Sequence, residues 1–344
     1  MFDSNIHIKK FAAVSLVLFL GIIFQPLKIN AQTKEVTAQK GDGIYRLLTR
    51  YGLPVSDYLN AFIELNKNDL GKNNTLIAGV KYKLPDGATV AEPPASPGGA
   101  FSTYSIFGKD YERVEILDNN LKGAVYYLVA GHGGPDPGAI GKYGDHNLCE
   151  DEYAYDVTLR LARNLIQHGA SVYMITRDPN DGIRNESYLK ADKDERCYPN
   201  QTIPLNQLKR LRQRTEAVNN LYLKNKKAFQ RMVVLHVDSR SHGENIDVFF
   251  YHDKRSNTGF KAANILLKTF QEKYNQHQPG RGYKGSVSTR NLYVVKNTYP
   301  VAVYIELGNI NHTRDQQRFI FVDNRQAIAN WLAEGLINDF KTNK

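Results

Sequence analysis

The sequence predicts an α/β fold, in which a mixed, mostly parallel sheet carries helices on both faces, preceded by a small strand-helix-helix-strand unit. Between residues 124 and 340, apolar strand-like runs alternate with amphipathic helical runs, as in sheets covered by helices on both faces. Three of these strand-like runs are followed or ended by a polar side chain, at His132, His236 and Glu306. The carboxyl ends of strands line the ligand crevice of open α/β sheets, so these side chains should converge.

The first 31 residues have the features of a secretory signal peptide. Lys9 and Lys10 precede an uninterrupted apolar stretch from Phe11 to Phe24, and Ala31 offers a small residue for cleavage. The apolar stretch is short for a membrane span, and an uncleaved anchor is the alternative. We therefore expect an exported protein that keeps no stable membrane insertion after cleavage.

The length of the chain limits the number of domains, and its net charge indicates which partners it attracts. A chain of 344 residues can hold one large domain and a small one. Removing residues 1–31 takes away three lysines and one aspartate, so the formal net charge falls from +10 to +8. Such a protein is attracted to anionic envelope polymers or lipid surfaces. The basic residues do not form runs with interleaved aromatics, so we do not expect nucleic acid as a partner.

The small unit covers residues 33–85. A turn at 40–43 opens one amphipathic helix, a second helix is expected over 55–66, and a short alternating strand ends the unit. This order resembles the LysM fold, which binds glycans that contain N-acetylglucosamine; an unrelated helical cap is the alternative. The sequence does not identify the glycan-binding residues. The resemblance rests on Val36, Gly41, Asp42, Ile44, Tyr51, Gly52, Asn66, Gly79, Leu84 and Pro85.

Residues 86–100 are rich in Gly, Ala and Pro and are expected to form a semi-extended linker. A tethered module raises the effective concentration of the attached domain near its polymer. The larger domain then runs over residues 101–344. We expect its strands at 125–129, 171–175, 232–235, 246–251, 293–295 and 301–305, and its helices at 153–168, 208–224, 262–274 and 325–340.

One stretch, 178–207, interrupts this alternation with about thirty mostly polar residues. Long irregular stretches in compact domains are usually lids or mobile insertions. The stretch contains Cys197, and a disulfide to Cys149 would pin it over the crevice. Two buried free thiols are the alternative.

The polar strand ends indicate a zinc hydrolase. Such enzymes need three protein ligands and a nearby carboxylate base. His132, flanked by glycines, and His236 are the candidate histidine ligands. A carboxylate at the end of an apolar strand is costly without a partner. We therefore expect Glu306 to be the general base that later passes its proton to the leaving amine.

The third ligand is expected from the acidic segment 150–152, although the helix dipole also favours acidic residues there. We prefer Glu152, because apolar residues recur from it at helical spacing. Glu150 is the alternative. The apolar positions counted from Glu152 are Tyr155, Leu159, Ala162 and Ile166.

From about Tyr126 to Phe340 the chain resembles the zinc-dependent N-acetylmuramoyl-L-alanine amidases of peptidoglycan. The resemblance implies one catalytic zinc ion on His132, His236 and Glu152 or Glu150, with Glu306 as the catalytic glutamate. It also implies that Arg177 and Arg214 support the site. The matching positions are His132-Gly133-Gly134 with Asp136, Gly138, Ala139 and Gly141, the acidic helix start, Thr176-Arg177, Arg214 with Ala217 and Asn219, His236, and Glu306 with Gly308 and Asn311.

The function that this resemblance implies is cleavage of the amide between N-acetylmuramic acid and L-alanine, in cell-wall remodelling or cell separation. Peptidoglycan would be the substrate, and a regulatory protein would be a further partner. The protein would be located in the periplasm or at the cell-wall exterior. A catalytically inactive peptidoglycan-binding or hydrolase-activating protein is the main alternative, and a zinc enzyme that cuts within the stem peptide is another. The sequence departs from the family pattern at 130–131, which alters the loop before His132 but removes no ligand. Two further departures, at Asp238 and at 307–309, concern substrate contacts more than chemistry.

Overall fold

The computed structural model describes residues 34–85 with short gaps, 101–239 and 245–344. The gaps in the first range are residues 39–41, 45–46, 49–50, 52, 54 and 72–73. The expected signal peptide, residues 1–31, and the expected linker, residues 86–100, lie outside the described residues.

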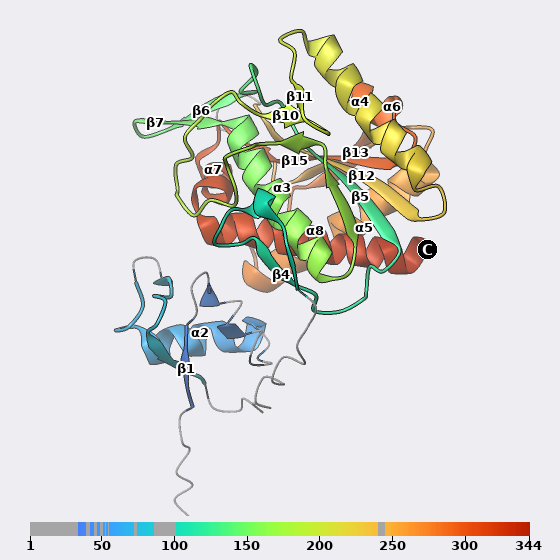
Figure 1. The fold of residues 1–344 in the computed structure, drawn as a ribbon. Helices are drawn as coiled ribbons and strands as arrows, with labels where there is room; N and C mark the ends of the chain where they lie inside the picture. The colour runs from blue at the N-terminus through green and yellow to red at the C-terminus, as the bar shows by residue number, and fades with distance from the viewer. Residues whose placement is uncertain are drawn as a thin grey trace, which may run out of the picture.

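A six-stranded sheet, in the order β14-β13-β15-β12-β5-β8, forms the centre of the larger domain (Figure 1). All neighbouring strands are parallel except β13 and β15, which are antiparallel. The expectation of a mixed, mostly parallel sheet is therefore confirmed. The strands are β5 (Ala124–Ala130), β8 (Ser171–Met174), β12 (Phe229–Asp238), β13 (Phe249–His252), β14 (Ser286–Thr289) and β15 (Val301–Asn309).

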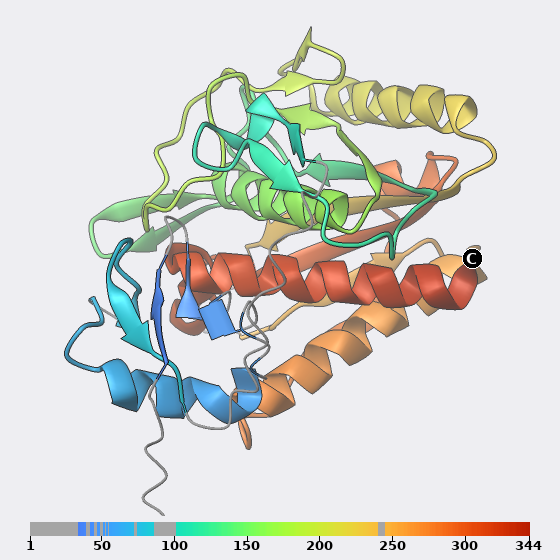
Figure 2. The same cartoon turned by 60° about the horizontal axis from the view of Figure 1, so that its bottom comes forward.

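Helices cover both faces of this sheet because side chains of a strand alternate between its faces. Tyr126 and Leu128 of β5 belong to the core shared with α3, α5 and α8, whereas Val125 and Tyr127 belong to the core shared with α4 and α6. Figure 2 shows α5 running beside α8. The helices are α3 (Glu150–Gln167), α4 (Gln207–Lys224), α5 (Asn257–His277), α6 (Tyr293–Lys296), α7 (Thr313–Ile320) and α8 (Val322–Asn343).

The expected strand at 293–295 is wrong, because these residues form the helical turn α6. The amides of Lys296 and Asn297 donate to the carbonyls of Leu292 and Tyr293, each at 3.0 Å, and close the turn. An apolar run this short has no periodicity that separates a strand from a helical turn. Elements not expected from the sequence are α7, β14, β3 (Phe101–Thr103), the 3-10 turn η2 (Ser105–Phe107), β4 (Arg113–Glu115), β6 (Ile140–Tyr143) and β7 (His146–Cys149).

The stretch 178–207 is tied to the domain by short strands and by buried arginines. The strands β10 (Arg196–Cys197) and β11 (Gln201–Thr202) extend β9 (Thr176–Arg177) into a three-stranded antiparallel sheet. Arg160 and Arg325 donate to the Arg184 carbonyl at 2.6 and 2.9 Å. These contacts hold the stretch against α3 and α8.

For the two cysteines, the structure shows the free thiols that were the alternative to a disulfide. Cys149 and Cys197 are both buried free thiols. The disulfide that would have pinned the 178–207 stretch is therefore not formed, and strand pairing and ion pairs hold that stretch instead.

The small unit has a core of its own. β1 (Glu35–Thr37) pairs antiparallel with β2 (Lys81–Lys83), and α2 (Val55–Asn66) packs Phe62 against Tyr82. The Asn66 side chain donates to the Lys83 carbonyl and accepts from the Lys83 amide, so it ties the helix to the last strand. Within the part of the chain that the structure describes, no helix has both the length and the apolar content needed to cross a membrane.

Candidate metal centre

Three side chains converge at the carboxyl edge of the central sheet. His132 follows β5, His236 lies near the end of β12, and Glu150 is the first residue of α3. One nitrogen of each histidine and a carboxylate oxygen of Glu150 lie within 4.8 Å of one another. Glu150 Oε1 is 2.8 Å from His236 Nδ1, and Glu150 Oε2 is 3.3 Å from His132 Nε2. Two imidazoles and one carboxylate form a ligand set that suits a catalytic zinc ion.

Strand register and two glycines bring these side chains together. Ala130 of β5 pairs with Leu235 of β12, so the histidines that follow lie at the same edge. A Cβ on Gly131 would come within 2.3–2.6 Å of the His236 ring, and one on Gly138 within 2.7 Å of Glu150 Oε2. Glycine at these two positions therefore lets the backbone approach the His236 ring and the Glu150 carboxylate closely.

Glu150 is buried and held by the backbone on two sides. Its Oε2 accepts from the Ala139 amide at 2.8 Å and its Oε1 from the Val237 amide at 3.0 Å. Burial by itself would raise the pKa of Glu150, but the hydrogen bonds to His132 and His236 outweigh it and lower that pKa below the usual range. Glu150 is therefore an ionised ligand candidate in a fixed position.

The structure groups the alternative, Glu150, with the two histidines, whereas the preferred Glu152 lies in a different group with Asp151 and Glu195. Glu152 Oε2 pairs instead with Arg184 Nη2 at 2.8 Å. The preference assumed that the apolar side of α3 faces the site, but α3 is buried on nearly all sides. Apolar positions therefore could not show which side of the helix faces the histidines.

Neighbouring side chains orient both histidines, as is usual for metal ligands. Asp136 Oδ2 lies 2.9 Å from His132 Nδ1 and also pairs with Arg210. Burial would lower the pKa of His132, but Asp136 and Glu150 raise it to about 9. His236 stacks on Tyr304 at 4.5 Å, and burial lowers its pKa. Sequence reasoning gave no role to Asp136, Arg210 or Tyr304, although Asp136 belonged to the quoted motif.

Glu306 lies beside this cluster in a buried position. It is the register partner of His236 across β12 and β15, and it is 5% exposed. Burial raises the pKa of Glu306 to about 8, with a further contribution from the charge of Glu150. Its Oε2 has no hydrogen-bond partner among the described residues, while Oε1 is 3.8 Å from Arg290 Nη1. A carboxyl group poised in this way can take up and release a proton near neutral pH.

The two arginines expected to support the site differ in their positions. Arg214 is buried and donates through Nη2 to the His132 carbonyl, so it holds the loop that carries this ligand. Arg177 donates to the Pro199 carbonyl at 3.2 Å, which places its contact on the 178–207 stretch. Arg214 therefore supports the cluster directly, whereas Arg177 holds part of the adjacent 178–207 stretch.

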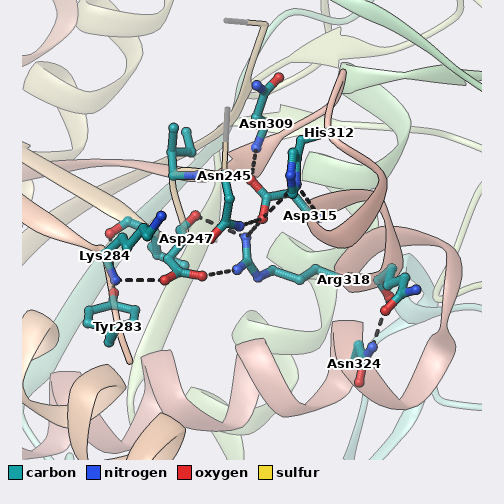
Figure 3. A network of polar contacts seen from close by, with 12 residues as sticks. Asn245, Asp247, Tyr283, Lys284, Asn309, His312, Asp315, Arg318 and Asn324 are labelled. Carbon is teal, nitrogen blue, oxygen red and sulfur yellow. Dashed lines mark hydrogen bonds and ion pairs between the residues drawn. The ribbon is translucent and has the colours of Figure 1, made fainter. Parts of the chain in front are cut away.

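A buried ionic network lies at the end of β15, the strand that carries Glu306 (Figure 3). Asp315 accepts from the Asn309 amide at 3.0 Å and from Arg318 Nη1 at 2.8 Å. Arg318 also pairs with Asp247, which accepts from the Lys284 amide at 2.7 Å. The network joins the end of β15 to α7 and to the segment before β13, and so fixes the backbone that carries Glu306.

The α/β sheet, the His-Glu-His cluster and the adjacent buried glutamate together define a metal-dependent hydrolase. The family comparison is more specific, because the N-acetylmuramoyl-L-alanine amidase model, Amidase_3, matches residues 127–338. The chain belongs to this family. It carries an N-acetylmuramoyl-L-alanine amidase domain that cleaves peptidoglycan, and the family is zinc-dependent.

Solved structures similar to this chain include several amidases. The catalytic domain of CwlV from Bacillus (Paenibacillus) polymyxa var. colistinus is 21% identical, with 63% of this chain and 98% of that chain covered and a TM-score of 0.46. An amidase from Clostridium difficile 630 is 17% identical, with 65% and 100% covered and a TM-score of 0.47. CwlD from Clostridioides difficile, solved with the GerS lipoprotein, is 17% identical, with 64% and 99% covered and a TM-score of 0.47. No curated protein matches the chain.

Proposed function

We propose that this chain is a zinc amidase that hydrolyses the bond between the lactyl group of N-acetylmuramic acid and L-alanine, with zinc held by His132, Glu150 and His236. The observation that carries the proposal is the convergence of these three donors within 4.8 Å, beside a buried Glu306. Bound zinc would polarise the scissile carbonyl and lower the pKa of the attacking water.

Side chains of the protein would transfer the proton and orient the metal ligands. Glu306 Oε2 accepts a proton from the attacking water and then delivers it to the nitrogen of the leaving L-alanine. Burial keeps this carboxylate from being solvated, so its affinity for a proton is high. Asp136 and Tyr304 hold the rings of His132 and His236 in place, which preserves the ligand geometry through the reaction.

We also propose that residues 33–85 are a LysM module that holds the enzyme on glycan strands. The antiparallel β1-β2 pair and α2 support this assignment. With residues 1–31 as a signal peptide and residues 86–100 as a tether, the enzyme would act in the periplasm or at the cell-wall exterior. Its role there would be cell-wall remodelling or cell separation, and a regulatory protein partner remains a prediction.

Digestion of purified sacculi tests the reaction. The zinc-loaded protein should release stem peptides with free L-alanine amino termini, whereas new amino groups within the stem would indicate the alternative peptidase. Activity that survives both complete chelation and Glu306→Ala would contradict the mechanism. Protein that is never exposed to chelator and contains no zinc would favour an inactive binding protein.

A further inference from the structure

A second cluster of acidic side chains lies next to the metal centre. Asp151 and Glu152 begin α3 directly after Glu150, and Glu195 precedes β10 in the 178–207 stretch. Carboxylate oxygens of the three lie within 4.8 Å of one another, and their exposed fractions are 2%, 2% and 4%. Three carboxylates from two segments therefore meet in the interior.

The hydrogen bonds of this cluster leave one carboxylate incompletely partnered. Asp151 Oδ1 accepts from the Glu152 amide at 3.0 Å, but its Oδ2 is buried and has no partner among the described residues. Glu195 Oε2 accepts from the Gly134 amide at 2.6 Å. Glu152 Oε1 accepts from the Asp192 amide at 3.0 Å. An unpartnered carboxylate oxygen this deeply buried requires a proton or a cation.

Neighbouring basic groups do not balance the charge. Arg184 pairs with Glu152, but it also pairs with Asp181. Arg214 interacts electrostatically with Glu195, but the Arg214 guanidinium donates its hydrogen bond to the His132 carbonyl. These two arginines therefore supply less positive charge than three ionised carboxylates would carry.

We propose that Asp151, Glu152 and Glu195 bind a hard divalent cation, with Ca²⁺ as the expected ion. All three donors are carboxylates, which suit Ca²⁺ or Mg²⁺, whereas the two imidazoles of the neighbouring centre suit zinc. Ca²⁺ accepts a flexible set of oxygen ligands, and Mg²⁺ demands near-octahedral geometry. This second site does not depend on the proposed zinc chemistry.

The bound cation would act as a clamp between two parts of the fold. It would join the start of α3 to the 178–207 stretch, whose Glu195 also holds the Gly134 amide two residues after His132. Calcium would thus stabilise both the stretch and the loop of the zinc ligand.

Calcium binding by the full-length, zinc-saturated protein tests the proposal. Elemental analysis after dialysis should find one Ca²⁺ per chain in addition to zinc, and Ca²⁺ should raise the melting temperature by a few degrees. Mg²⁺ in a parallel titration should compete weakly. Failure of both ions to bind at millimolar concentration would overturn the proposal and leave protons as the partners of these carboxylates. Because zinc is measured in the same samples, loss of the zinc site is distinguished from loss of the calcium site.

Matched variants locate the ion. Glu195→Gln removes a charge but keeps an acceptor for the Gly134 amide, and it should weaken Ca²⁺ binding by at least about tenfold. Asp151→Asn should do the same and serves if Glu195→Gln does not fold. Asp194→Asn is the control, because Asp194 belongs to a neighbouring acidic group with Asp178 and Asp192. Loss of binding in the control alone would place the ion there and overturn the proposal.

Discussion

Glu150 and Glu152 lie two residues apart at the start of α3, but their carboxylates serve different partners. Glu150 Oε1 is 2.8 Å from His236 Nδ1, and Glu152 Oε2 is 2.8 Å from Arg184 Nη2. Two residues correspond to about 200° of rotation around an α-helix, so the side chains leave the helix on opposite sides. Only one of the two can face the histidines.

Glu150→Gln should therefore lose zinc while Glu152→Gln keeps it. Removing a charged ligand should weaken zinc binding by more than about 100-fold, beyond the usual effect of an outer-sphere change. Zinc content and competition with a chromogenic chelator measure both variants. Zinc loss in Glu152→Gln with retention in Glu150→Gln would contradict the ligand assignment.

Glu306→Gln should lower kcat by about 10²–10⁴-fold without changing zinc content, because the amide cannot accept the proton. Stem-peptide release from sacculi measures the rate. Wild-type zinc content and an unchanged circular dichroism spectrum are the controls. A rate close to that of the wild type would show that another group carries the proton.

Gly131→Ala should weaken zinc binding by about tenfold or more, because the new methyl group overlaps the His236 ring and this ligand must shift. Gly144→Ala is the matched control. Its Cβ meets nothing within 4 Å, and its φ of +58° predicts a loss of about 1 kcal/mol in stability without an effect on zinc. Equal zinc affinities for the two variants would contradict the packing explanation.

Asp247→Asn should lower the free energy of unfolding by about 3 kcal/mol near pH 7, because it leaves Arg318 and Arg281 incompletely paired in the interior. Burial would raise the pKa of Asp247, but Arg281 and Arg318 outweigh it and lower that pKa.

The stability that Asp247 contributes is therefore present above its unfolded pKa of about 4 and is lost as the pH falls through the folded value. The difference between wild type and variant in urea unfolding should shrink below about pH 4. Asp253→Asn, at the ion pair with the exposed Arg255, should have a much smaller effect. A difference that grows on acidification would contradict the assigned charge state.

The cysteines should react as two free thiols only after unfolding. Both are buried, and burial raises the pKa of Cys197 to about 11, so the reactive thiolate is scarce at neutral pH. A thiol reagent should count two groups per chain in denaturant without reductant and react slowly with the native protein. Zero groups in denaturant would show a disulfide between Cys149 and Cys197.

The sequence predicted the central strands and the long helices well, because residues that pack on both faces of a sheet produce strong local patterns. Short elements were less predictable. The run at 293–295 is aromatic and β-branched, yet two backbone hydrogen bonds close it into a helical turn. The stretch 178–207 was predicted to be irregular. Its strands β10 and β11 have two residues each and pair only in the folded domain, so they leave no pattern in the sequence.

The sequence by itself determined that His132, His236 and Glu306 would meet, because each lies at or near the carboxyl end of a strand of one sheet. It could not determine which glutamate joins the histidines. That choice depends on how α3 is rotated, and a helix buried on nearly all sides has no single apolar face to reveal its rotation. Only the tertiary structure set that rotation, through the Ala139 and Val237 amides that hold Glu150 and the Arg184 side chain that draws Glu152 away.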